Sequence, residues 1–160
     1  MAVTIQNRPP KYLVCVDERP ESRVALRLAC AKAVVRGGRV EILHVLLPAD
    51  FQSLNAVADL MREEQRADAE ALLQRLSAEA YETYGIMPSV SLRDGQIGEA
   101  IITAATEDYD ASMLVLGVAE QGSGRGGLVS WLANQLGARL VIPLLLVPGN
   151  LTDQQLQNVI

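Results

Sequence analysis

The segment Tyr12-Leu-Val-Cys-Val16, which Asp17 follows, decides the fold. A short run of apolar and β-branched residues that Gly, Pro or Asp bounds is typical of a strand buried on both faces of a parallel sheet. A helical pattern comes next. Pro20 lies in its first turn, apolar residues recur three and four positions apart, and Gly37-Gly38 ends it. The beginning of the chain therefore predicts a strand followed by a helix.

The same alternation continues along the chain. Further strands are predicted at residues 39–47, 88–92, 112–116 and 143–147. Further helices are predicted at residues 54–84, 97–107 and 128–140, whereas no clear pattern defines a tail at residues 151–160. Strands that alternate with helices indicate right-handed crossovers. We expect an α/β fold, an open doubly wound parallel sheet with helices on both faces, in one domain over residues 1–160 (core 11–148, C-terminal tail 149–160).

The long helix at residues 54–84 carries like-signed charges on neighbouring turns, because Arg62 and Arg66 lie four residues apart. Such pairs weaken an isolated helix, so packing must stabilise this one. We expect four side chains to provide that packing, namely Leu60, Ala67, Ala71 and Leu72.

The composition excludes several classes of partner. The chain has 14 Lys and Arg against 19 Asp and Glu, a net charge of −5, which argues against nucleic acid as a partner. No run reaches the roughly 18 apolar residues of a membrane span, and the first ten residues lack the apolar region of a secretory signal. Two cysteines make no disulfide framework, which favours a reducing, cytoplasmic location.

Motifs for metal binding and catalysis are missing. Cys15, Cys30 and His44 include no closely spaced ligand pair, and no other histidine exists, so we expect no metal site. The chain has neither a P-loop nor a G-x-S-x-G motif. Residues Glu18-Arg19-Pro20 follow the first strand, where adenylating enzymes on a similar sheet place a Gly-Ser loop for pyrophosphate. We expect that the protein is not an enzyme.

Candidate binding residues follow the strands. Asp17 comes after the first strand, Val45 lies near the end of the second, and Gly117 ends the fourth. A glycine-rich segment then leads to a helix start, and it contains Gly122, Ser123, Gly124, Arg125, Gly126 and Gly127. Backbone N–H groups in such a segment can cradle an anion, although a solvent-exposed loop without a ligand has the same composition. If the sheet is doubly wound, its ligand site lies at the carboxyl ends of the strands.

The glycine spacing alone does not identify a dinucleotide site. Gly122, Gly124 and Gly127 fit G-x-G-x-x-G, but this motif follows the fourth predicted strand and not the first. About 20 residues further on, the chain has Val147 where an acid should contact a ribose hydroxyl.

Taken together, residues from about 11 to 148 resemble the universal stress proteins. The matching stretches are Leu13-Val-Cys-Val-Asp17, Ile42-Leu-His-Val45, Asp110-Ala-Ser-Met-Leu-Val-Leu-Gly117 and Ile142-Pro-Leu-Leu-Leu-Val147. The resemblance implies a five-stranded parallel sheet in the order 3-2-1-4-5. It also implies a homodimer, often paired through the last strand, here residues 143–147.

Some members of this family bind ATP or AMP through Gly, two residues, Gly, nine residues, and Gly with Ser or Thr. By this resemblance Asp17, Val45 and Gly117 match the binding members. Glu120 replaces the second Gly, Ser130 the third, and Trp131 the hydroxyl residue. A second alignment instead places Gly124-Arg-Gly-Gly-Leu128 on the family's Gly-Arg-Ser-Gly-Leu. In the first alignment the Glu120 carboxylate would repel phosphates unless a divalent cation lies between them.

Two hypotheses follow from the sequence. In the first, a regulatory protein binds ATP (with Mg²⁺) or AMP in the crevice between the first and fourth strands. In the second, a homodimer without nucleotide acts through protein contacts. The nucleotide hypothesis assigns the site to Asp17, Val45, Gly117, Gly122, Ser123, Gly124, Arg125, Gly126, Gly127 and Ser130.

Overall fold

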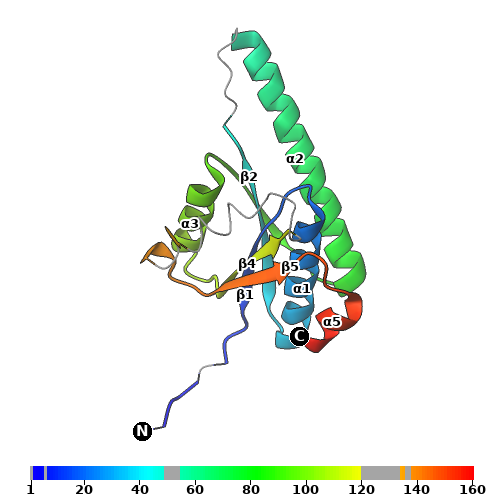
Figure 1. Cartoon of the computed structure of the whole chain (residues 1–160), viewed down its shortest axis with the longest axis vertical. Coiled ribbons are helices and arrows are strands. Elements are labelled where there is room, and N and C mark those ends of the chain that lie inside the picture. Colours follow the sequence, from blue (N-terminus) through cyan, green and yellow to red (C-terminus); the bar gives the residue numbers. More distant parts are fainter. Residues whose placement is uncertain (1, 6, 49–54, 120–133, 136–137) are drawn as a thin grey trace.

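The computed structural model describes residues 2–5, 7–48, 55–119, 134–135 and 138–160 (Figure 1). Its centre is a parallel sheet in the order β3-β2-β1-β4-β5, the order that the family resemblance implies. The five strands are β1 (Lys11–Cys15), β2 (Arg39–Leu46), β3 (Ser89–Asp94), β4 (Met113–Val118) and β5 (Leu144–Pro148). Each predicted strand is present, and no end differs from the prediction by more than two residues.

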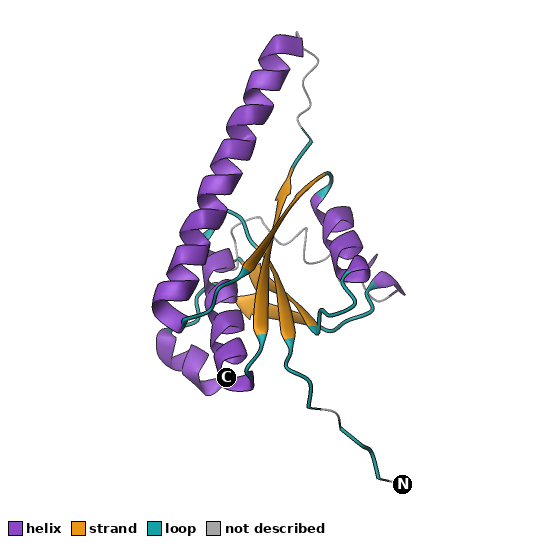
Figure 2. Ribbon diagram, turned by 180° about the vertical axis from the view of Figure 1, so that it is seen from behind, coloured by secondary structure: helices purple, strands orange, loops and turns teal. Residues whose placement is uncertain are grey.

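Helices cover both faces of this sheet, as predicted. Helices α1 (Pro20–Arg36), α2 (Asn55–Tyr84) and α5 (Asp153–Asn158) lie on one face, and α3 (Ile97–Glu107) lies on the other (Figure 2). The predicted helix at residues 128–140 falls largely outside the described residues.

Side chains of the central strand alternate between two apolar cores. Val14 points into the larger core, which α1 and α2 cover. Its neighbours Leu13 and Cys15 point into the smaller core beneath α3. Because both faces of β1 and β4 are buried, their sequences are nearly continuous apolar runs. This double burial is why such a short segment identifies the fold.

Helix α1 begins and ends where the sequence predicts. Pro20 occupies the first turn, where its fixed φ suits a helix and its missing N–H costs nothing. Gly37 ends the helix with a φ of 64°, in the left-handed region that favours glycine, and its N–H donates to the Ala33 carbonyl. Glu21 in the first turn and Arg36 in the last complement the helix dipole.

Helix α2 extends beyond the body of the domain (Figure 1). Its buried residues begin only at Ala69 and continue with Leu72, Leu73, Leu76 and Ala80. Of the four packing residues expected from the sequence, only Leu72 is buried, and the expectation for Leu60, Ala67 and Ala71 was wrong. The sequence pattern is helical throughout, but only the second half of the helix reaches the core.

The C-terminal tail forms a short helix that the sequence pattern did not predict. Thr152 caps α5 in a capping box, since its hydroxyl accepts from Gln155 N–H and the Gln155 side chain accepts from Thr152 N–H. Leu156 is the single buried residue of α5, and it packs in the larger core. One buried leucine gives no helical periodicity, so the pattern could not show this helix.

Within the described ranges, no helix has the length and apolar character needed to cross a membrane.

Candidate functional site

The strand order places the reversal of winding between β1 and β4, where open α/β sheets hold their ligands. In the register of the sheet, Cys15 of β1 lies opposite both Leu43 of β2 and Leu116 of β4. Asp17 therefore follows β1 at the same edge at which β4 reaches Gly117. The structure brings these two candidate residues together at the carboxyl edge of neighbouring central strands.

The two carboxylate oxygens of Asp17 make different contacts. Oδ1 accepts hydrogen bonds from the Arg19 backbone N–H (2.8 Å) and from the Ser22 hydroxyl (2.7 Å), whose oxygen in turn accepts from the Asp17 N–H (2.9 Å). Oδ2 lies 3.7 Å from Nε of Arg19, and the side chain is 36% exposed. Oδ1 thus holds the backbone at the start of α1, while Oδ2 belongs to a side chain that is still partly exposed at the carboxyl edge.

Gly117 lies within β4, one residue before its end, and it allows the first turn of α1 to approach the sheet. A Cβ atom at this position would lie 2.2 Å from the Glu21 carbonyl oxygen. Gly149, just after β5, is similarly close, because its Cβ would lie 2.7 Å from Cβ of Glu21. Gly117 is therefore needed for packing, whether or not a ligand also contacts it.

Val45 and His44 lie inside β2, and both have structural partners. The Val45 side chain is buried in the core beneath α3, so a ligand at this edge could reach only its backbone. Nδ1 of His44 lies 2.7 Å from the Val16 carbonyl oxygen. Because a carbonyl only accepts, Nδ1 carries the proton and donates it. His44 connects β2 to the end of β1.

The remaining candidate residues lie outside the described part of the chain. These residues are Gly122, Ser123, Gly124, Arg125, Gly126, Gly127 and Ser130, together with the two departures from the family motif, Glu120 and Trp131.

Comparison with known proteins decides the family. The model of the universal stress protein family matches residues 10–148. The chain belongs to this family. No curated protein sequence matches it.

Solved structures of universal stress proteins share the fold. UspA from Lactobacillus plantarum is 16% identical, with a TM-score of 0.73 over 88% of this chain and 98% of its own. The Arabidopsis thaliana family member with AMP bound is 17% identical, with a TM-score of 0.60 over 88% and 92%. The Archaeoglobus fulgidus protein in complex with dAMP is 20% identical, with a TM-score of 0.58 over 89% and 99%.

Two further residues belong to the carboxyl edge of this universal stress protein. Ser22 is only 5% exposed, yet its hydroxyl satisfies both the backbone and the carboxylate of Asp17. Arg19 places a half-exposed guanidinium beside Asp17. Neither residue is predicted as a site residue by the sequence motifs. A serine five residues after the acid, at a helix start, is a weak signal that could have identified Ser22.

The two cysteines take no part in the site. Cys15 is buried in the core beneath α3 and Cys30 in the core beneath α1 and α2, so one metal ion cannot bind both. Burial raises the pKa of each thiol to about 12, so both remain protonated at neutral pH. Among the described residues, no group of three His, Cys, Asp or Glu side chains could hold a metal ion.

Proposed function

We propose that this universal stress protein binds an adenine nucleotide, ATP or AMP, at the carboxyl edge between β1 and β4. The observation that carries the proposal is the convergence of Asp17 and Gly117 on the first turn of α1, at the reversal of strand order. Family membership supports it, as do the similar folds of the Arabidopsis protein with AMP and the Archaeoglobus protein with dAMP.

Each residue has a specific role in this proposal. Oδ2 of Asp17 accepts a hydrogen bond from a hydroxyl or amine of the adenosine, while Oδ1 stays with Arg19 N–H and Ser22. The guanidinium of Arg19 and the glycine-rich residues 122–127 receive the phosphates. For ATP, Mg²⁺ would offset the repulsion between Glu120 and the phosphate charge.

The nucleotide in this proposal is a regulatory ligand and not a substrate. Support comes from the two potential nucleophiles of the chain that are cysteines, since both thiols are protonated and buried. We propose a cytoplasmic regulator whose contacts with other proteins change when nucleotide binds.

Isothermal titration calorimetry tests the proposal with ATP, AMP and cyclic AMP, each with and without Mg²⁺. We expect saturable binding of ATP or AMP. Asp17→Asn should weaken it at least tenfold, about 1.4 kcal/mol, because the amide oxygen can keep the contacts of Oδ1 while the charge on Oδ2 is lost. Replacing Gly124 and Gly126 by Val should abolish binding.

The matched control is Asp110→Asn. Asp110 is also an exposed aspartate, but it lies before β4 at the opposite edge, 3.6 Å from Arg8. Its replacement should leave the affinity unchanged. Equal losses in both variants, or no heat from the unmodified protein at high nucleotide concentration, would exclude this site.

A nucleotide-free homodimer is the second candidate, and the edge strand β5 favours it. Beyond β4, the described residues place no strand next to β5, and Leu146 is 39% exposed there. An apolar edge strand with unpaired backbone groups is suited to pairing with a second copy. Light scattering after gel filtration should show a dimer that Leu146→Lys converts to a monomer. A monomer before substitution would reject this assembly.

A further inference from the structure

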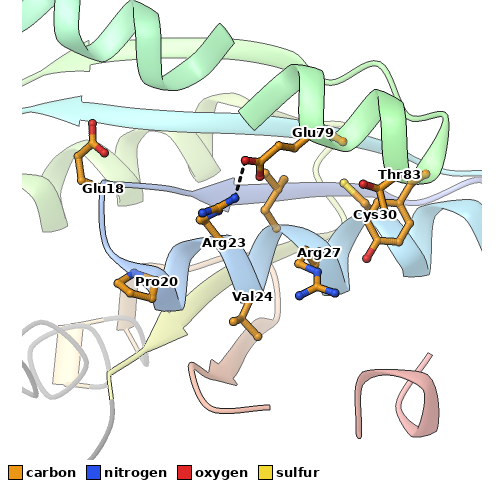
Figure 3. A pocket seen from close by; sticks show the side chains of 11 residues that line it. Glu18, Pro20, Arg23, Val24, Arg27, Cys30, Glu79 and Thr83 are labelled. Carbon is orange, nitrogen blue, oxygen red and sulfur yellow. Dashed lines mark hydrogen bonds and ion pairs between the residues drawn. The ribbon is translucent and has the colours of Figure 1, made fainter. Parts of the chain in front are cut away.

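The two halves of helix α2 are packed differently. In the second half, apolar side chains enter the core, and Glu79 pairs with Arg23 of α1 at 2.5 Å, as the dashed line in Figure 3 shows. In the first half, every side chain from Ala56 to Asp68 is exposed except that of Ala58, which is partly buried. Packing of an apolar stripe supplies most of the stability of a helix in a protein. The first half lacks this packing within the described chain, so its surface is free to dock another molecule.

Three large apolar side chains form one stripe on this first half. Val57, Leu60 and Met61 lie three and four residues apart, which places them on one side of the helix. They are 48%, 57% and 39% exposed. Apolar side chains that are grouped on a surface, and not scattered singly, are typical of interaction sites.

Acidic side chains continue the same stripe. Glu64 lies seven residues after Val57, and Asp68 lies seven residues after Met61, about two turns further along the same face. The two acids are four residues apart, and like charges at this spacing repel each other. Among the residues that the structure describes, neither acid takes part in an ion pair. A cation from another molecule would relieve this repulsion.

The two arginines of the first half point away from this stripe. Arg62 and Arg66 lie at least about 100° around the helix axis from it. Both line a hollow that Pro48 and Asp94 also line, at the carboxyl edge of the sheet, and Arg66 pairs with Asp94 there at 3.5 Å. The outer face of α2 is therefore apolar at its start and acidic at its end, and the arginines do not neutralise it.

This pattern disfavours a second copy of the chain as the occupant. Two outer faces that pair in parallel would place each acid opposite the same acid of the other copy. Two faces that pair antiparallel over the whole stripe would place Glu64 against Val57 of the other copy, and a carboxylate that loses water without gaining a cation is unfavourable. The acids would also repel an anionic lipid surface.

We propose that the outer face of α2 docks a basic amphipathic helix of another protein. The apolar side of that helix covers Val57, Leu60 and Met61, and its Lys or Arg side chains pair with Glu64 and Asp68. The proposal does not depend on nucleotide binding at Asp17, and the experiment that tests it contains no nucleotide.

Fluorescence anisotropy of a labelled model peptide tests the proposal with the full-length protein. The probe is an amphipathic helix of Leu and Lys, with Leu at positions a and d of each heptad. Its matched control peptide carries Glu in place of every Lys. We expect saturable binding of one Leu–Lys peptide per chain, at an affinity that falls as the salt concentration rises. The Leu–Glu peptide should bind at least about tenfold more weakly.

Two double variants separate the apolar contribution from the charged one. Leu60→Gln/Met61→Gln removes most of the apolar stripe, and Glu64→Gln/Asp68→Asn removes its charge. Each should weaken binding of the Leu–Lys peptide by at least about tenfold, and the second should also reduce the salt dependence. All four side chains are exposed, so melting curves should show that both variants remain folded.

The matched control is Val34→Gln/Val35→Gln at the end of α1. These apolar side chains are 52% and 66% exposed, but the charged residues beside them are Lys32 and Arg36. Their replacement should leave the affinity for the Leu–Lys peptide within about twofold. The proposal fails if this control weakens binding as much as the two double variants, if the Leu–Glu peptide binds equally well, or if the anisotropy shows no saturable change.

Light scattering and lipid vesicles test the other occupants of the outer face. The proposal expects that Leu60→Gln/Met61→Gln leaves the oligomeric state unchanged and that the protein does not sediment with phosphatidylglycerol vesicles. A dimer that this variant converts to a monomer would assign the face to a second copy. Sedimentation that the variant abolishes would assign it to a membrane surface, and either result would overturn the proposal.

Discussion

Two charged groups at opposite edges of the sheet, one around Lys11 and one around Asp17, are paired differently. At the amino edge, Nζ of Lys11 in β1 lies 2.6 Å from Asp108 and 3.4 Å from Glu41, and these side chains are only 14% to 21% exposed. At the carboxyl edge, Asp17 pairs with Arg19, two residues away, and both remain 36% to 49% exposed. The first group joins separate elements, whereas the second is local.

This difference separates stabilising charges from charges available to a ligand. A partly buried ion pair between distant segments ties them together, and removing one partner leaves the others unpaired. A local, exposed pair contributes little to stability. We therefore expect substitutions at the amino edge to change stability and substitutions at Asp17 to change binding.

The largest effect on stability is expected at Gly117, where the backbone of β4 lies directly against the first turn of α1. Gly117→Val places a side chain against the Glu21 carbonyl, so we expect a loss of about 3 kcal/mol in the free energy of unfolding. Urea denaturation measures it. The control is Gly37→Ala, where a Cβ meets no atom within 4 Å but φ is 64°. That change should cost only about 1 kcal/mol. Equal losses in the free energy of unfolding would mean that α1 does not pack closely against β4 at Gly117.

The second largest loss of stability is expected at the amino edge of the sheet. Lys11→Met removes the ammonium group that pairs with Asp108, so we expect a loss of about 2 kcal/mol in the free energy of unfolding. Urea denaturation at neutral pH measures this loss. Arg139→Gln serves as the control because its pair with Glu99 is exposed, and its loss of stability should be clearly smaller than that of Lys11→Met. If Lys11→Met is as stable as the control, the amino-edge cluster is not stabilising.

The pH dependence of stability should follow Asp108. Burial opposes its ionisation, but the hydrogen bond from Lys11 and the backbone N–H of Asp110 outweigh burial and lower its pKa. A carboxyl with a lowered pKa in the folded state stabilises at neutral pH, and this contribution is lost as the pH falls below about 4. Urea denaturation should show a smaller acid-induced loss for Asp108→Asn than for the unmodified protein. Parallel pH profiles would contradict this assignment.

The strands and α1 could be predicted because their physical signals are local. Tyr12–Val16 is apolar throughout since both faces of β1 are buried, and Gly37 marks the end of α1. The strand order required the family resemblance, because periodicity contains no information on which strands pair. The tail helix α5 was missed because Leu156 alone anchors it.

The candidate site was predictable only in part. Asp17 and Gly117 could be placed at one edge because parallel strands end together. The partners of Asp17 depend on where α1 begins relative to the end of β1. Only the structure therefore shows that the Ser22 hydroxyl contacts both the backbone N–H and the carboxylate of Asp17. The burial of the Val45 side chain depends on which face of β2 packs against α3.

The smallest stability effect is expected for Asp17→Asn. The amide oxygen can still accept from Arg19 N–H and from the Ser22 hydroxyl, so the free energy of unfolding should change by less than about 0.5 kcal/mol. Thermal unfolding without ligand measures this change. A large loss would mean that the charge of Asp17 is structural, like that of Asp108, and would remove the distinction between the two edges.

A crystal structure of the protein grown with AMP tests the central claim most directly. We predict that the adenosine lies at the carboxyl edge between β1 and β4, with one of its donor groups about 2.7 to 3.2 Å from Oδ2 of Asp17. At saturating AMP, an empty edge, or a nucleotide bound elsewhere on the chain, would contradict the claim.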